Sequence, residues 1–129
     1  MRAQALVTAA ISVLVFGTAF PGLGRAQQST SQYVTMKWSF QNNYRYTLFM
    51  QLYAQHTDHV WPGAREYYKM NDSSAHESKI KCWEGEKICY GAWTADGKKY
   101  WGVGRNNSHR CEDCCVVCAS GDRGTRILR

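Results

Sequence analysis

The sequence of 129 residues lacks the features that mark several common classes of protein. Apolar residues nowhere keep the 3.6-residue period of an amphipathic helix convincingly, which argues against a helical bundle. There is no H-E-x-x-H or G-x-S-x-G segment, and this absence excludes the zincin and nucleophile-elbow arrangements. His56 and His59 have no evident third ligand with which to hold a catalytic metal. We therefore expect no enzymatic activity, no metal and no cofactor.

Positive charge exceeds negative charge, but no element in the body of the chain concentrates it. The formal net charge is +6, and Arg123, Arg126 and Arg129 near the C-terminus supply much of it. In the middle of the chain, Lys79 and Lys81 alternate with acidic residues. Nucleic-acid binders usually gather basic residues on one element with aromatic residues nearby. We therefore predict that nucleic acid is not a partner.

Residues 1–26 have the pattern of a secretory signal peptide. Arg2 precedes an uncharged segment whose apolar centre spans residues 11–16. Gly24 and Ala26 place small residues at the two positions that a signal peptidase reads, which predicts cleavage after Ala26. The alternative, a retained membrane anchor, would need roughly 20 apolar residues, and no cysteine is present here to carry a lipoprotein anchor. We predict a periplasmic or secreted protein with no membrane attachment after cleavage.

Residues 33–118 are predicted to form one β-rich domain, after a short flexible leader at residues 27–32. Met36, Trp38 and Phe40 alternate with polar residues, which is the period of a strand with one buried face. The apolar residues of segment 47–54 predict a second strand that forms an antiparallel hairpin with the first. Further strands are predicted at residues 67–70, 76–82, 88–93 and 100–103, the last two joined by the Asp96-Gly97 turn of a second hairpin.

This pattern of short strands and turns predicts a mostly β fold, a small antiparallel β-sandwich or barrel stapled by disulfides. One segment could instead be helical, because Cys111, Cys114, Cys115 and Cys118 recur at the spacing of one helical face. Residues 119–129 contain three arginines and are predicted to be a basic flexible tail.

All six cysteines lie within the predicted domain, at Cys82, Cys89, Cys111, Cys114, Cys115 and Cys118. An even number of cysteines on a secretory route predicts disulfides, each adding about 2–4 kcal/mol of stability. Six cysteines allow 15 pairings, and the sequence does not choose among them. Cys114 and Cys115 should bond to two different partners, because a bond between chain neighbours is strained. Two alternatives for the C-x2-C-C-x2-C run are a thiolate metal site and a redox-active pair.

The aromatic residues give the best indication of a binding function. Tyr90, Tyr100 and Trp101 lie on the two arms of the second hairpin, where cross-strand pairing brings side chains together. If Cys89 marks the inward face of its strand, Trp93 points inward and Tyr90 points outward. Tyr90 with Tyr100 or Trp101 is then a candidate platform for a glycan or a partner protein. The alternative is that these rings are ordinary core and cross-strand packing.

Longer motifs give the chain a resemblance to a known group of proteins. At Trp61-Pro62-Gly63, G-E-K-I-C-Y-G-A-W (residues 85–93), Y-W-G-V-G (residues 100–104) and the closing cysteine run, it resembles small exported proteobacterial proteins with a domain of unknown function. The similarity covers most of residues 33–118. It implies export and a cysteine-containing domain, and it assigns no catalytic residue. The expected function is binding of a glycan or a protein at the cell envelope, and the alternative is thiol-redox or metal-binding activity of the cysteine run.

Overall fold

The computed structural model describes Gly17, Gly22 and residues 32–129. Apart from those two glycines, the predicted signal peptide at residues 1–26 lies outside the described residues, and so does the predicted leader up to residue 31. Among the described residues, no helix is long and apolar enough to cross a membrane.

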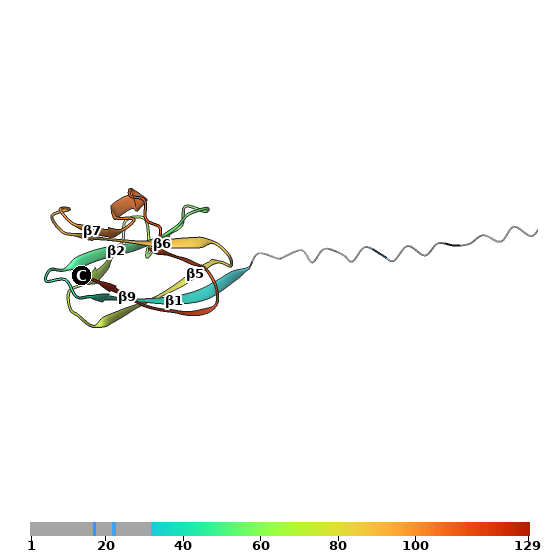
Figure 1. The fold of residues 1–129 in the computed structure, drawn as a ribbon, viewed down its shortest axis with the longest axis horizontal. Helices are drawn as coiled ribbons and strands as arrows, with labels where there is room; N and C mark the ends of the chain where they lie inside the picture. The colour runs from blue at the N-terminus through green and yellow to red at the C-terminus, as the bar shows by residue number, and fades with distance from the viewer. Residues whose placement is uncertain (1–16, 18–21, 23–31) are drawn as a thin grey trace, which may run out of the picture.

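The domain is a mostly β fold in which two sheets pack face to face, as predicted (Figure 1). The described residues form nine strands and one short 3-10 helix: β1 (Tyr33–Asn42), β2 (Leu48–Ala54), β3 (Val60–Trp61), β4 (Tyr68–Met70), β5 (Ala75–Trp83), β6 (Lys87–Thr94), β7 (Tyr100–Gly102), η1 (Arg105–Asn107), β8 (Cys115–Val117) and β9 (Gly121–Leu128). The first sheet has the order β5-β1-β9. The second has the order β3-β2-β6-β7, with β4 also pairing β2 and β8 also pairing β6.

Strand β1 is the centre of the first sheet and confirms the period-two pattern of its sequence. Met36, Trp38 and Phe40 are buried, whereas the side chains between them are partly exposed. Alternate residues of a strand point to opposite faces of the sheet. The apolar face of β1 therefore packs against the second sheet, and the polar face meets solvent.

The predicted hairpin between β1 and segment 47–54 is wrong, because β1 and β2 belong to different sheets. The two edges of β1 are occupied by β5, which is antiparallel, and by β9, which is parallel. Strand β2 pairs instead with β6 from Leu48 to Ala54. The residues between β1 and β2 thus cross from one sheet to the other instead of forming a tight turn. Alternation in a sequence identifies a strand and its buried face, but not its partner.

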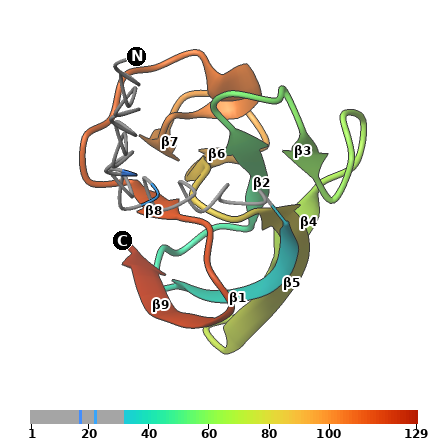
Figure 2. The ribbon, with the colours of Figure 1, turned by 90° about the vertical axis from the view of Figure 1, so that its right-hand side faces the viewer.

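The predicted flexible tail at residues 119–129 is also wrong, since most of this segment is strand β9. Figure 2 shows β9 lying along β1 at the edge of the first sheet. Leu128, only 1% exposed, belongs to the hydrophobic core, and Asp122 forms an ion pair with Lys37 of β1 at 3.2 Å. Basic residues are compatible with an edge strand, because exposed charges there discourage pairing with another chain.

Strand β6 lies inside the second sheet and has neighbours on both edges. It pairs with β2 on one edge and with β7 and β8 on the other. The β6–β7 pairing confirms the predicted second hairpin across the Asp96-Gly97 turn, where Gly97 has a positive φ of 71°. Seven of the eight residues of β6 are buried, so both faces of this strand are covered.

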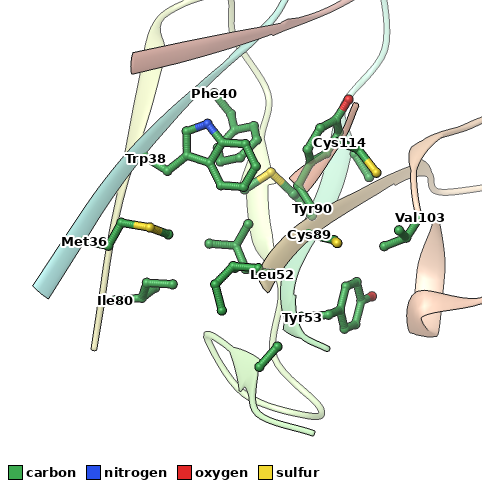
Figure 3. Packing of buried hydrophobic residues seen from close by; sticks show 14 of the residues in the cluster. Met36, Trp38, Phe40, Leu52, Tyr53, Ile80, Cys89, Tyr90, Val103 and Cys114 are labelled. Carbon is green, nitrogen blue, oxygen red and sulfur yellow. The ribbon is translucent and has the colours of Figure 1, made fainter. Parts of the chain in front are cut away.

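The main core lies between the two sheets (Figure 3). Its largest fully buried side chains include Phe40 and Met36 from β1, together with Leu48, Met50 and Leu52 from β2. Because burial of each such side chain contributes about 1.5–3 kcal/mol relative to exposure, this interface supplies much of the stability of the domain.

Three disulfides connect the six cysteines: Cys82–Cys118, Cys89–Cys115 and Cys111–Cys114. As predicted, Cys114 and Cys115 bond to different partners. The helical alternative for the cysteine run is wrong, because Cys115 begins strand β8, where it lies opposite Cys89 of β6. Cys82–Cys118 joins β5 of the first sheet to the segment after β8. Three disulfides in so small a domain indicate an oxidising, extracytoplasmic environment.

Candidate binding site

The structure does not bring the three residues of the predicted aromatic platform together. Tyr90 is only 7% exposed and lies in the core between the sheets. Its ring centroid is 5.3 Å from that of Phe40 and 5.8 Å from that of Trp38 (Figure 3). Burial raises the pKa of Tyr90 above the ordinary value of tyrosine, with the nearby Arg126 acting in the opposite direction. The prediction that Tyr90 points outward is therefore wrong.

Tyr100 and Trp101 are neighbours on β7 and point to opposite faces of the sheet. Tyr100 lies opposite Trp93 and stacks on His109, with ring centroids 3.7 Å apart. Trp101 lies opposite Ala92, on the face of the sheet that meets the core. A single flat surface cannot include both rings.

The error about Tyr90 came from taking Cys89 as the mark of the inward face. The outer face of β6, which carries Cys89, Gly91 and Trp93, is also buried, because loops cover it. A Cβ on Gly91 would lie 1.9 Å from the carbonyl oxygen of Gly104. The backbone of Gly104 thus occupies the space beside Gly91, and a side chain at this position would not fit.

A different group of aromatic rings, one exposed and two partly buried, gathers at one end of the sandwich. We call Tyr44, Tyr46 and Trp101 the aromatic cluster. The ring centroid of Tyr44 is 5.0 Å from that of Trp101 and 5.7 Å from that of Tyr46, and both contacts are edge-to-face. Tyr46 is 56% exposed, the highest value among the large aromatic side chains of the described residues. The cluster joins the β1–β2 loop to the β6–β7 hairpin.

Two cations lie over these rings. The Lys99 Nζ is 4.3 Å from the ring centroid of Tyr44 and 4.9 Å from that of Trp101. The Arg45 guanidinium carbon is 4.9 Å from the ring centroid of Tyr46. Cation–π contacts at exposed sites contribute about 0.5–1 kcal/mol each. They help to hold the rings in one arrangement and give the cluster a positive charge.

The buried side chain of Asn42 determines the shape of the loop that carries Tyr44 and Tyr46. Its Oδ1 accepts a hydrogen bond from the backbone N–H of Tyr44 at 2.8 Å. Its Nδ2 donates to the carbonyl oxygens of Tyr46 and of Met70, each at 2.9 Å. The loop is therefore anchored to β4 and does not depend on its own exposed residues for its conformation.

The β6–β7 turn beside the cluster is equally well anchored. The Thr94 hydroxyl donates to Oδ1 of Asp96 at 2.6 Å, and the Lys98 backbone N–H donates to the same oxygen at 3.0 Å. These bonds hold the pKa of Asp96 below its usual value, the Thr94 hydroxyl being the larger cause. The turn places Lys99 over the ring of Tyr44.

A cavity of about 500 Å³ adjoins the aromatic cluster. It lies between the β1–β2 loop and the turn that connects β4 to β5. Its lining comprises Asn42, Asn43, Tyr44, Arg45, Tyr46, Thr47, Asn71, Asp72 and Ser73. A smaller cavity of about 250 Å³ is lined by Tyr46, Thr47, Thr94, Ala95 and Asp96. Tyr46 and Thr47 therefore line both hollows.

Asp72 supplies a carboxylate to the larger cavity. Its Oδ1 accepts hydrogen bonds from the Ser74 backbone N–H at 3.0 Å and from the Ser74 hydroxyl at 2.5 Å, and it contacts His76 Nε2 at 2.9 Å. The Ser74 hydroxyl is the largest cause of a lowered Asp72 pKa, followed by the Ser74 N–H and His76. Asp72 is consequently ionised at neutral pH, and Oδ1 rather than Oδ2 makes all of these contacts.

Within residues 32–129, the serine, aspartate and histidine of the β4–β5 turn are not arranged as a catalytic triad. Asp72 lies between Ser74 and His76, whereas nucleophile activation requires the histidine to contact the serine. His59 packs against Trp61, with ring centroids 6.0 Å apart. Within residues 32–129, the one group of three candidate metal ligands is Cys89, Cys114 and Cys115, and all three sulfurs are engaged in disulfides.

Sequence reasoning missed the aromatic cluster, although Trp101 was among the predicted residues. The segment Asn42-Asn43-Tyr44-Arg45-Tyr46 lies between the first two predicted strands and was assigned no binding role. An available signal was the presence of two tyrosines within five loop residues. Comparison of the chain with family models, curated proteins and solved structures found no match.

Proposed function

We propose that the domain is an exported, non-enzymatic carbohydrate-binding protein of the cell envelope, and that the aromatic cluster with its adjoining cavity is the binding site. The observation that carries this proposal is the position of Tyr46, a largely exposed ring at the junction of two cavities. The predicted signal peptide and the three disulfides support export.

The chemistry of the site suits a sugar. The apolar face of a pyranose ring packs against an aromatic ring, while its hydroxyls require hydrogen-bond partners around the rim. The larger cavity offers amide, carboxylate and hydroxyl groups from Asn43, Asn71, Asp72 and Ser73. Its volume of about 500 Å³ lies within the range of about 300–1,000 Å³ typical of small-molecule sites. One or two sugar rings would occupy it.

The rigidity of the site also favours this function. Ordering flexible side chains or loops on binding costs roughly 0.5–1.5 kcal/mol per side chain. Asn42 already fixes the β1–β2 loop, and Thr94 with Asp96 fixes the β6–β7 turn. A ligand would therefore meet a surface that is largely preformed.

A protein partner is less well supported by the same surface. Stable protein–protein interfaces bury about 800 Å² on each partner and usually have an apolar centre. Here the exposed rings are few and are surrounded by charged and amide side chains, including Arg45, Lys99 and Asp72. The site resembles a small polar pocket with an aromatic wall more than a flat apolar patch.

The test is binding of the oxidised domain, residues 27–129, to an array of bacterial envelope glycans, followed by titration calorimetry with a positive glycan. Tyr46→Ala should weaken binding at least tenfold, because it removes the exposed ring without touching the core. Tyr100→Ala is the matched control, since Tyr100 is similarly exposed, at 49%, but lies on the other face of the sheet. It should leave the affinity unchanged.

Two results would overturn the proposal. One is the absence of any glycan bound above background by the folded, oxidised protein. The other is equal weakening by Tyr46→Ala and Tyr100→Ala, which would place the ligand away from the cluster. Capture of a specific protein in a parallel pull-down, with the array negative, would replace the carbohydrate with a protein partner.

A further inference from the structure

The three disulfides differ greatly in their access to solvent. Cys82 and Cys118 are completely buried, and Cys89 is nearly so. Cys111 and Cys115 are partly exposed, whereas Cys114 is completely buried. The Cys111–Cys114 and Cys89–Cys115 bonds therefore each have one cysteine that is open to solvent, whereas Cys82–Cys118 has none.

The Cys111–Cys114 bond closes the shortest loop of the three. Cys111 and Cys114 are separated by 3 positions, compared with 36 for Cys82–Cys118 and 26 for Cys89–Cys115. The stabilisation expected from restricting the unfolded chain grows with loop length. Opening the Cys111–Cys114 bond should thus cost the fold less than opening either of the others.

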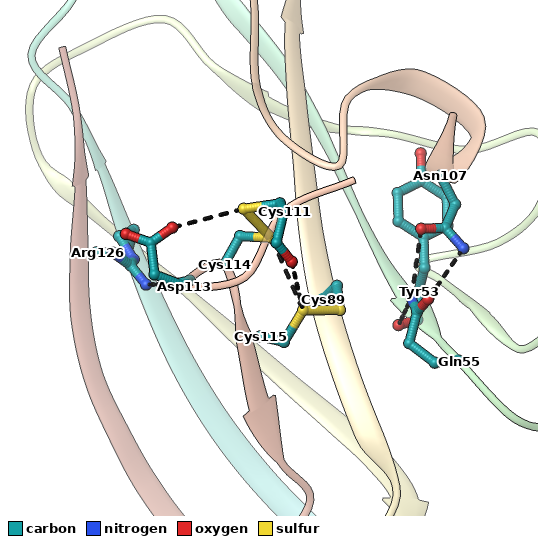
Figure 4. Close-up of a disulfide and its surroundings, with 9 residues drawn as sticks. All are labelled: Tyr53, Gln55, Cys89, Asn107, Cys111, Asp113, Cys114, Cys115 and Arg126. Atoms are coloured by element: carbon teal, nitrogen blue, oxygen red, sulfur yellow. Dashed lines mark hydrogen bonds between the residues drawn. A yellow bond between two sulfur atoms is a disulfide. The ribbon is translucent and has the colours of Figure 1, made fainter. Parts of the chain in front are cut away.

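The buried sulfur of this pair lies beside a second disulfide. Cys114 Sγ is 3.7 Å from Cys115 Sγ, and the Sγ atoms of Cys89, Cys114 and Cys115 all lie within 4.8 Å of one another. Figure 4 shows Cys89, Cys111, Cys114 and Cys115 gathered close together. The Cys111–Cys114 and Cys89–Cys115 disulfides are therefore neighbours, and Cys82–Cys118 is not part of this group of sulfurs.

From this arrangement we propose that Cys111–Cys114 is an exchange-active disulfide that reacts with external thiols through Cys111, while Cys82–Cys118 is purely structural. This activity is independent of carbohydrate binding, because the two sites share no residue. The substrate class is a thiolate, either of a small molecule or of a cysteine in another exported protein.

The reaction is thiol–disulfide exchange and needs no separate oxidant. An incoming thiolate, RS⁻, attacks Cys111 Sγ, so that an R–S–S–Cys111 bond forms while the Cys111–Cys114 bond breaks and Cys114 leaves as the thiolate. A second RS⁻ then attacks the R sulfur, releasing RSSR and the Cys111 thiolate. The pair gains two electrons and the two external thiols lose them.

Access to solvent decides this direction of attack, because Cys111 is partly exposed and Cys114 is completely buried. Asp113 Oδ1 lies 3.6 Å from Cys111 Sγ, and a nearby carboxylate disfavours negative charge on that sulfur. Burial disfavours the thiolate of Cys114 as well, so neither effect opposes attack at Cys111. Arg126 donates a hydrogen bond to the Asp113 carbonyl, which ties the segment that carries Cys111 to β9.

The Cys114 thiolate has a second course open to it. It can attack Cys89 Sγ, forming Cys89–Cys114, breaking Cys89–Cys115 and releasing the Cys115 thiolate. The Cys115 thiolate can then attack Cys111 of the mixed disulfide, forming Cys111–Cys115 and returning RS⁻. This second course rearranges two disulfides with no net oxidation or reduction.

In the test, the folded, oxidised domain is incubated with reduced glutathione without denaturant. Excess iodoacetamide is added to samples at timed intervals to alkylate the free cysteines, which mass spectrometry then maps. Cys111 should be modified, together with Cys114 or Cys115, at least ten times faster than Cys82 or Cys118. A reduced cysteine-containing peptide replaces glutathione in a second arm. Faster reaction with the peptide would assign a protein substrate, and faster reaction with glutathione a small thiol.

A double variant, Cys111→Ser with Cys114→Ser, is the control. It retains two disulfides and should release no thiol under the same conditions, with an unchanged near-ultraviolet circular dichroism spectrum. If that variant fails to fold, the labelling rates of the unmodified protein decide the matter alone. Equal labelling of all six cysteines, labelling that begins elsewhere than at Cys111, or no reaction with either thiol would overturn the proposal.

Discussion

Asn42 and Tyr44 are joined by a hydrogen bond of 2.8 Å from the Tyr44 backbone N–H to the Asn42 Oδ1. The residue that ends β1 thereby fixes the first ring of the aromatic cluster. The same side chain reaches Met70 of β4 through its Nδ2. One buried amide thus connects the last residue of β1, the loop of the binding site and strand β4 of the second sheet.

Replacement of Asn42 by alanine should destabilise the domain by about 2–4 kcal/mol. The change removes three hydrogen bonds, each worth about 0.5–1.5 kcal/mol, and leaves the buried Met70 carbonyl without that donor. Urea denaturation monitored by tryptophan fluorescence measures the effect. Asn43→Ala is the control, because Asn43 is exposed and its side chain accepts a hydrogen bond from that of Gln41 at the surface. An equal effect of the two changes would show that Asn42 does not anchor the loop.

Tyr90→Ala should cost about 3–5 kcal/mol, the range for removing a large aromatic side chain from a core. Tyr90 packs against Trp38 and Phe40, so its removal leaves a cavity between the two sheets. Tyr100→Ala, at an exposed position, should cost less than about 1 kcal/mol. Chemical denaturation curves of the two variants measure the loss of unfolding free energy in each. The opposite ranking would mean that Tyr90 faces solvent, as the sequence alone had suggested.

The burial of β6 explains why its side-chain directions could not be predicted. In β1, polar residues occupy the outer face, so the alternation in the sequence Val34-Thr-Met-Lys-Trp-Ser-Phe40 indicates which face is buried. In β6, the sequence Lys87-Ile-Cys-Tyr-Gly-Ala-Trp-Thr94 has almost no polar residue on either face. Loops cover its outer side, and period-two reasoning has nothing there to distinguish the two faces.

Strand pairing and disulfide pairing were undetermined for a related reason. The number of cysteines and their compartment predict that bonds form, and the Asp96-Gly97 turn predicts the adjacent β6–β7 pair. The pairing of β1 with β9, by contrast, joins segments about 85 positions apart. Such long-range contacts depend on the packing of the whole chain, and no local sequence pattern predicts them.

Strand β9 should be required for stability, although its sequence has the composition of a solvated tail. Leu128→Ala should cost about 2–5 kcal/mol, because Leu128 is completely buried against the core. Ile127→Ala is the matched control, since Ile127 is 41% exposed and points away from the core; it should cost less than about 1 kcal/mol. Thermal unfolding followed by circular dichroism measures both. If removal of residues 121–129 leaves the melting temperature unchanged, β9 contributes nothing to the fold.

Through its hydrogen bond to Asp72, the Ser74 hydroxyl should determine the pH at which Asp72 stops stabilising the fold at the β4–β5 turn. Its hydrogen bond is the largest cause of the lowered Asp72 pKa. A carboxyl whose pKa is lower in the folded state than in the unfolded chain stabilises the fold above the unfolded value, about 3.9, and loses that contribution as pH falls through the folded value. Ser74→Ala removes the main cause, so the Asp72 pKa should rise toward its ordinary value and the loss should begin at higher pH.

Titration of the Asp72 carboxyl by NMR between pH 2 and pH 7 measures this shift directly. Ser73→Ala is the control, because Ser73 is an exposed neighbour that makes none of the hydrogen bonds to Asp72. It should leave the titration unchanged. The carboxylate would also be the acceptor offered to a sugar hydroxyl, so glycan affinity should fall as pH drops through the Asp72 pKa, and Ser74→Ala should move that fall to higher pH. An Asp72 titration that is identical in the parent protein and in Ser74→Ala would contradict both expectations.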